Sequence, residues 1–340
     1  MKIIEISALQ KTYRINKKKK GVKGIISNLF RPEYVFKKAV NNISFDIEQG
    51  DIVGLIGPNG AGKSSLIKML VGIMKPDAGS VKVFGYEPFR QRRLYTKNIG
   101  VVFGQRSSLW WDLSVIDSFE LLRKIYKVPD AQYDETLAYL VKTFDLQSLL
   151  HQPVRMLSLG QKLRCTIASA MLHSPDILFL DEPTIGLDVL SIDQLLSILE
   201  KMNRERQTTI FITSHDLNVV ERLCRRILLV YNGEILFNGS FPDAIKRFNT
   251  YKRLRLSLSN KDKLSELVEK LPSELKVESS NETQLVLVFN HQELSYDRLL
   301  DFLRLLLLDK STGLYEFYLE KPDLNELILT LFYSYRKDNK

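Results

Sequence analysis

Long apolar segments are absent from this 340-residue sequence. The most apolar stretch, Leu299 to Leu308, contains Asp301 and Arg304, whereas a helix that crosses a bilayer needs about 20 predominantly apolar residues. We therefore predict no transmembrane helix. The chain starts with Met1-Lys2 and an alternating strand pattern, without the apolar core and cleavage site of a signal peptide. Any role at a membrane is expected to depend on a separate membrane protein.

Cysteine is scarce as well. The two cysteines, Cys165 and Cys224, lie far apart in apolar helical patterns and have no CxxC spacing. This arrangement favours ordinary buried thiols in a reducing cytoplasm over a disulfide framework or a cysteine metal site.

Positive charge is concentrated in one segment. Most of the net charge of +9 lies between Asn16 and Lys38, where eight basic residues accompany one acidic residue, Glu33. Such a block indicates a solvated loop, an anionic lipid surface or, as the least favoured alternative, nucleic acid. The basic residues are Lys17, Lys18, Lys19, Lys20, Lys23, Arg31, Lys37 and Lys38.

Hydrophobic spacing predicts an α/β fold in the first 240 or so residues. Expected strands are 2–6, 41–47, 52–56, 80–84, 99–103, 177–180, 208–213, 227–230 and 234–238, with 10–40 as a loop-rich excursion. Expected helices are 63–71, 159–172, 192–206 and 216–223, and residues 113–150 carry helical spacing broken at Pro129-Asp130.

The pattern changes after Gly239. Strands are expected at 253–258, 275–278, 284–289 and 315–319, and helices at 261–271, 294–308 and 324–332. The order β-α-β-β-α-β, followed by a helix, predicts a small α+β domain of ferredoxin-like type. We therefore expect a first, α/β domain over 1–242, with the basic insertion at 16–38 and a helical subdomain at about 106–170, and a second domain over 250–340.

Residues 57–64, GPNGAGKS, match the phosphate-loop pattern GxxxxGK[ST] between a buried strand and a helix. Glycines let backbone N–H groups turn around phosphate oxygens, the lysine pairs with the β and γ phosphates, and the serine hydroxyl is suited to Mg²⁺. The candidate ligands of ATP here are Gly57, Asn59, Gly60, Ala61, Gly62, Lys63, Ser64 and Ser65.

A second motif ends the strand expected at 177–180. Asp181 at the end of this strand can hold the Mg²⁺ shell, and Glu182 can orient or deprotonate an attacking water. An Asp-Glu-Pro sequence alone is typical of a helix start. The phosphate loop upstream, at a separation suited to one parallel sheet, is what makes it a catalytic candidate.

Further motifs occur in an order that resembles the ATP-binding cassette (ABC) ATPases. They are Tyr13, the phosphate loop, Gln105, Leu157-Ser158-Leu159-Gly160-Gln161, Asp181-Glu182, Gly186-Leu187-Asp188 and His215. The match covers about residues 1–240. The resemblance implies an α/β P-loop NTPase with a mixed-sheet core and an inserted helical subdomain, to which the small α+β domain is appended.

The resemblance also implies roles for single residues. Tyr13 would stack on adenine, although it is also suited to be an ordinary strand aromatic. Gln105 would sense Mg²⁺, together with Ser64 and Asp181, and link to the membrane subunit; the alternative is a surface glutamine. His215 would lie beside the γ-phosphate and join Lys63 and Glu182 in catalysis, unless it is structural.

The signature residues Ser158, Gly160 and Gln161 would contact ATP held by a second subunit, and Asp188 would line the dimer contact. Ser158 is also a good helix N-cap, and both roles are compatible. Leu159 replaces the usual first glycine of the signature. Leucine does not adopt a positive φ cheaply, so a β or α backbone is expected there, and the variant resembles that of some exporter-type (ABC-2) ATPases.

Trp110-Trp111 follows Gln105 closely and would face a membrane subunit, or else pack into the helical subdomain. Three features together resemble the ATPases of ABC-2 exporters. They are this tryptophan pair, the basic insertion, and Pro322 to Leu327 before the last helix. We therefore expect a Mg²⁺-dependent ATPase, working as a homodimer beneath a permease on the inner face of the cell membrane, with lipid contact through Lys17–Lys20. An importer ATPase, or a soluble ABC ATPase acting on ribosomes or DNA, is the alternative.

Overall fold

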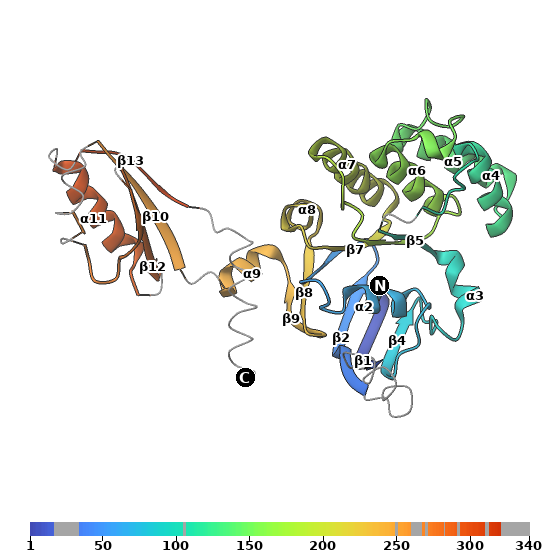
Figure 1. Cartoon of the computed structure of the whole chain (residues 1–340), viewed down its shortest axis with the longest axis horizontal. Coiled ribbons are helices and arrows are strands. Elements are labelled where there is room, and N and C mark those ends of the chain that lie inside the picture. The colour runs from blue at the N-terminus through green and yellow to red at the C-terminus, as the bar shows by residue number, and fades with distance from the viewer. Residues whose placement is uncertain are drawn as a thin grey trace, which may run out of the picture. The chain divides into compact units, whose positions relative to one another are not determined.

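The computed structural model describes residues 1–16, 34–104, 107–248, 251–259, 267–268, 271–281, 283–290, 293–309 and 313–320. Two compact units, Met1–Ser240 and Phe241–Lys340, make up the chain (Figure 1). The lysine run 17–20, Gln105 and the helix expected at 324–332 lie outside the described residues. Within the described part of the chain, no helix is both long enough and apolar enough to cross a membrane.

A six-stranded sheet carries the first unit, in the order β5-β6-β7-β3-β8-β9. Its strands pair in parallel except β9, which runs antiparallel to β8. Every residue of β3 and β7 is buried, which explains why both strands are continuous apolar runs rather than alternating ones. The bounds are β3 Ile52–Ile56, β5 Ile99–Phe103, β6 Ile177–Asp181, β7 Thr209–Ser214, β8 Arg226–Tyr231 and β9 Glu234–Gly239.

A second, antiparallel sheet has the order β2-β1-β4, with β1 at Lys2–Asn16, β2 at Tyr34–Glu48 and β4 at Ala78–Val83. The expected loop at 10–40 is wrong at both of its ends, because residues 10–16 and 34–40 continue the ladder as far as the pair Asn16 and Tyr34. This outer part of the hairpin is largely exposed, so no apolar alternation marks it in the sequence.

Helix α2 (Lys63–Leu70) is the next element after β3, across the phosphate loop. It contributes Leu66, Ile67 and Leu70 to a core shared with both sheets. The Tyr95 hydroxyl donates to the Leu70 carbonyl over 2.6 Å from within this core, and burial raises the pKa of that hydroxyl. The phosphate loop therefore leads into a helix that is anchored in the buried core.

Helices cover the face of the six-stranded sheet that points away from β1, β2 and β4 (Figure 1). The helical stretch expected at 113–150 is divided at Pro129, which precedes the first turn of α5 and cannot continue α4. The bounds in this unit are α3 Arg92–Tyr95, α4 Val115–Tyr126, α5 Asp130–Phe144, α6 Leu159–Met171, α7 Val189–Arg206 and α8 Leu217–Leu223.

The second unit has a four-stranded antiparallel sheet in the order β11-β12-β10-β13, which is the ferredoxin-like strand order. Helix α11 packs Leu299, Phe302 and Leu303 against buried leucines of the sheet. Of the helix expected at 261–271, residues 267–268 and 271 are described; 267–268 are helical, and 271 is not. The bounds are α9 Phe241–Phe248, β10 Tyr251–Leu258, β11 Lys276–Ser280, β12 Gln284–Asn290, α11 Tyr296–Leu308 and β13 Leu314–Leu319.

Candidate functional site

The phosphate loop leaves β3 and enters α2 through two glycines with positive φ, Gly60 at 81° and Gly62 at 112°. A Cβ on Gly62 would lie 2.1 Å from the Ala39 carbonyl oxygen, so this position requires glycine for space as well as for backbone angle. The close approach of β2 fixes the loop. Because α2 begins at Lys63, the free N–H groups of its first turn lie at the loop and can bind an anion.

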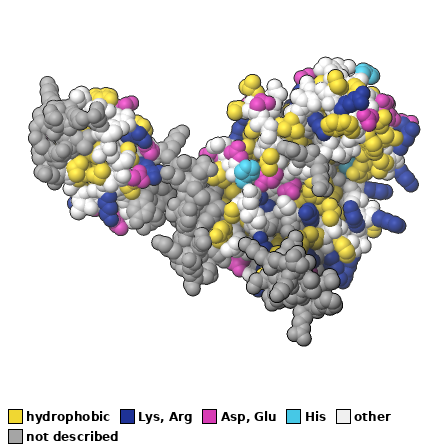
Figure 2. All heavy atoms as spheres, viewed as in Figure 1, with side chains coloured by type: hydrophobic (Ala, Val, Ile, Leu, Met, Phe, Trp, Pro, Cys, Tyr) yellow, Lys and Arg dark blue, Asp and Glu magenta, His cyan; other side chains and the backbone are white. Residues whose placement is uncertain are grey.

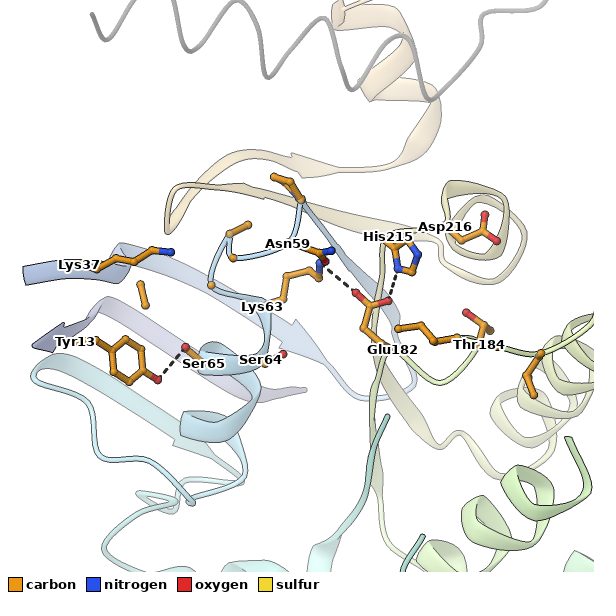
Figure 3. A pocket seen from close by; sticks show the side chains of 18 of the residues that line it. Tyr13, Lys37, Asn59, Lys63, Ser64, Ser65, Glu182, Thr184, His215 and Asp216 are labelled. Carbon is orange, nitrogen blue, oxygen red and sulfur yellow. Dashed lines mark hydrogen bonds and ion pairs between the residues drawn. The ribbon is translucent and has the colours of Figure 1, made fainter. Parts of the chain in front are cut away.

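Lys63 folds back over its own loop. Its Nζ donates to the Gly57 carbonyl over 2.6 Å and lies 3.1 Å from Glu182 Oε1. The second oxygen of Glu182 lies 2.7 Å from His215 Nδ1 (Figure 3). Lys63 and His215 thus contact the two oxygens of the Glu182 carboxylate. The three residues follow three different strands, β3, β7 and β6. Lys63 and Glu182 are largely shielded from solvent, with 6% and 14% of their side chains exposed.

Thr213 contacts both residues of the Asp181-Glu182 pair. Its hydroxyl donates to Asp181 Oδ1 over 2.7 Å and accepts from the Glu182 backbone N–H over 2.9 Å. These bonds stabilise Glu182 in the left-handed region, with φ at 51°, a conformation that costs a non-glycine residue about 1–3 kcal/mol. Sequence reasoning missed Thr213, since its role depends on the register of Asp181 opposite Thr213 in the sheet.

Ser64 Oγ lies 3.4 Å from Asp181 Oδ1. A hydroxyl and a carboxylate oxygen facing each other at the loop suit a small hard cation, which takes oxygen ligands and shares others with substrate phosphates. These two residues therefore fit the predicted Mg²⁺ role. Gln105, the third predicted ligand, lies outside the described residues, although Gly104 just before it donates its N–H to the Asp181 carbonyl over 2.7 Å.

Beside the loop is a cleft of about 700 Å³ that includes Tyr13 and Ser65. The Tyr13 hydroxyl lies 3.1 Å from Ser65 Oγ, which places the ring next to the start of α2 (Figure 3). Lys37, which the sequence suggested was part of the basic insertion, also lines this cleft. The predicted ligands that line it are Tyr13, Asn59, Gly60, Ala61, Gly62, Lys63, Ser64, Ser65, Glu182 and His215.

The signature residues Ser158, Gly160 and Gln161 do not line this cleft in the described part of the single chain. Ser158 caps α6, where its Oγ accepts from the Gln161 N–H over 3.2 Å and its own N–H donates to Gln161 Oε1 over 2.9 Å. Leu159 is the first helical residue, in agreement with the α or β backbone that we expected there.

Asp188 caps α7 in the same way, accepting from the Ser191 N–H over 2.9 Å and from the Ser191 hydroxyl over 2.7 Å. The hydrogen bond from the Ser191 backbone is the main cause of the lowered pKa of Asp188. Because a Cβ on Gly160 would lie 2.7 Å from Ser191 Oγ, the starts of α6 and α7 touch at this point. Asp188 therefore supports the segment that carries the signature.

Known proteins are similar to this chain over most of its first unit. The family model of the ABC transporter matches residues 40–185. Methionine import ATP-binding protein MetN 2 of Enterococcus faecalis is 32% identical over 259 residues, which cover 75% of this chain and 75% of that protein. Bacitracin transport ATP-binding protein BcrA of Bacillus licheniformis is 33% identical over 228 residues, covering 67% and 73%.

The chain belongs to the ATP-binding subunits of ABC transporters. A solved dimer of the ATP-binding cassette MJ0796, in a post-hydrolysis state bound to ADP and Pi, is similar with a TM-score of 0.56 at 25% identity, covering 70% of this chain and 98% of that one. The predicted P-loop ABC fold is confirmed, and the protein is an ATPase. Subunits of this family dimerise and work with transmembrane permeases.

Gly62→Ala should abolish nucleotide binding by this ABC subunit, because the new Cβ displaces either the loop or the Ala39 carbonyl. Gly85→Ala is the matched control, since Gly85 also has a positive φ, at 76°, but faces open space. We expect titration with ADP to show no saturable binding for the first variant and an affinity within about twofold of the wild type for the second. Equal affinities of the two variants would contradict the loop geometry described here.

Proposed function

We propose that this chain is the ATP-hydrolysing subunit of an ABC-2-type membrane exporter, in which two copies close on ATP and drive a separate permease. The observation that carries the hydrolytic part is the meeting of Lys63, Glu182 and His215 at the phosphate loop. Each of these groups has a use in phosphoryl transfer. The Lys63 ammonium group can bind the phosphate, the Glu182 carboxylate can accept a proton from water, and the His215 imidazole can form a hydrogen bond beside them.

ATP would bind with its adenine on Tyr13 and its phosphates in the loop. Backbone N–H groups and Lys63 then hold the phosphoryl group in line while negative charge develops on its oxygens. Magnesium, held by Ser64 and Asp181, would neutralise part of the phosphate charge. Lys63 would exchange its present contacts, the Gly57 carbonyl and Glu182, for phosphate oxygens.

Glu182 changes its role in the same step. In the structure its two oxygens face Lys63 and His215, so neither is directed at a water alone. Movement of Lys63 to the phosphate frees Oε1 to accept a hydrogen bond from the attacking water. His215, 56% exposed and on the cleft side of Glu182, can keep the other oxygen in place. Nucleotide binding would thereby prepare the carboxylate that hydrolysis needs.

A second copy of the chain would complete the site. The signature residues Ser158, Gly160 and Gln161 lie apart from the cleft of their own chain, and next to them the start of α7 exposes two apolar side chains, Val189 at 82% and Leu190 at 76%. Exposed apolar groups beside a cleft favour an interface. The proposal therefore assigns Asp188 and its neighbours to the contact between two cassettes.

Glu182→Gln should bind ATP and form a stable dimer but lose turnover by about 10²–10⁴-fold, because the amide cannot accept the proton of the attacking water. ATPase assays and size-exclusion chromatography with ATP measure the two effects. Glu221→Gln, which alters an exposed carboxylate on α8, should retain wild-type turnover and dissociate after hydrolysis. An ATP-loaded Glu182→Gln variant that elutes only as a monomer would count against ATP-driven closure.

Export is the direction we favour. One relative, BcrA, is named for bacitracin transport, and another, LnrL of Bacillus subtilis, for linearmycin resistance. Import is the second candidate, because MetN 2, a methionine import protein, covers 75% of this chain. The inner membrane face is the proposed location, and the lipid contact of Lys17–Lys20 stays a prediction.

Trp110 and Trp111 are the proposed contact with the permease. They are 39% and 57% exposed, and Lys162 of α6 lies over the Trp111 ring at 4.4 Å from its centre. On the face shown in Figure 2, hydrophobic side chains gather around the part of the first unit that carries α4, and basic side chains project beside them. An exposed aromatic pair, of which Trp111 contacts Lys162 of the helix that starts at the signature, is suited to pass movement to a partner.

Purification of the tagged chain from membranes should recover a permease, and reconstituted vesicles should show transport from the ATP-exposed side to the opposite side. Trp110→Ala or Trp111→Ala should reduce this recovery and the transport rate several-fold while ATPase activity without permease stays within about twofold. Leu300→Ala, at an exposed apolar site on α11 of the second unit, serves as the control. Transport in the reverse direction would favour the importer alternative, and equal loss of ATPase and transport would assign the tryptophans to packing.

A further inference from the structure

Lys37 lies directly opposite Tyr13 in the antiparallel pairing of β1 and β2. Side chains of directly opposite residues lie on the same face of a sheet, with their Cβ atoms about 4.5–5.5 Å apart. Both side chains line the cleft beside the phosphate loop. The strand register therefore places an ammonium group next to the ring that is proposed to hold adenine.

The Lys37 side chain extends from β2 toward the loop (Figure 3). A Cβ placed on Gly60 would lie 3.5 Å from Lys37 Nζ, which shows how near the ammonium group comes to the tip of the loop. Gly60 has a positive φ of 81° and carries no side chain that would separate the two. The Lys37 ammonium group thus lies close to the backbone of the phosphate loop, within the same cleft.

Two lysines, Lys63 and Lys37, are among the described residues that line the cleft, and they differ in burial and in their contacts. Lys63 is buried and already contacts the Gly57 carbonyl and Glu182. Lys37 is exposed, and among the described residues we find no hydrogen bond or ion pair that occupies it. A cation that pairs with none of the described residues, at the rim of an anion-binding loop, is available to an anionic ligand.

We propose that Lys37 is a second phosphate-binding lysine, whose Nζ donates to a polyphosphate oxygen of the bound nucleotide. This rests on the proposed function, since a ligand with its base on Tyr13 and its phosphates in the loop passes the Lys37 ammonium group. The ligand class is a nucleoside di- or triphosphate. Lys37 is a binding residue here, with no part in the proton transfer assigned to Glu182.

The test is a titration of the full chain with ADP and with the non-hydrolysable analogue adenylyl imidodiphosphate. In low salt, Lys37→Ala should weaken binding about three- to fivefold, as expected for one exposed charge-assisted contact. Lys37→Arg retains the charge and should bind within about twofold of the wild type. Lys38→Ala is the matched control, because Lys38 is exposed on the same strand, pairs opposite Thr12 and is not among the lining residues described.

The salt dependence of the affinity distinguishes loss of a charge contact from a structural effect of the substitution. The affinity difference between the wild type and Lys37→Ala should shrink several-fold at high ionic strength, where exposed charges are screened. A loss with the analogue but not with ADP would assign the contact to the γ-phosphate, and a loss with both would assign it to the α or β phosphate. Lys37→Ala binding like Lys38→Ala, or a loss that salt does not change, would overturn the proposal. If the wild type bound neither nucleotide, the proposed function itself would fail, which is a different result.

Discussion

The site depends on the parallel register of β6 and β7, which places Thr213 beside Asp181. One hydroxyl there holds the Asp181 carboxylate and the backbone N–H of Glu182. Since β3 is the other neighbour of β7, the same pairing brings the phosphate loop and Lys63 within reach of Glu182. A shift of β6 by one residue would reverse which faces its side chains occupy, and the carboxylates would no longer meet the lysine.

This constraint explains which features the sequence could predict. The strand at 52–56 and its glycine loop were predictable because a buried apolar run and the loop pattern are both local signals. Asp181-Glu182 was predictable as a catalytic pair because the phosphate loop lies upstream at a suitable separation, and the helix break at Pro129 follows from the geometry of proline. The P-loop ABC fold was predicted from the resemblance to ABC ATPases, which these motifs carry only together with the signature and His215.

Features that depend on pairing between distant residues were not predictable. Thr213 became part of the site only through the order of β6 and β7. Lys37 resembled one more lysine of a basic insertion until the pairing of β1 with β2 placed it opposite Tyr13. The same pairing was invisible over 10–16 and 34–40, because exposed strands there carry no apolar alternation. Helix α7 begins three residues before the expected Ile192 because Asp188 caps it.

The central claim is that a complete ATP site takes the loop from one copy of the chain and the signature from another. Mixing two inactive variants tests it: Lys63→Met, which spoils the loop, and Ser158→Asp, which keeps the helix cap but repels phosphate. A mixed dimer would retain one complete site, so we predict that ATPase activity, absent from either variant alone, returns when they are combined. A mixture as inactive as its components would contradict the claim, because a site built within one chain gains nothing from mixing.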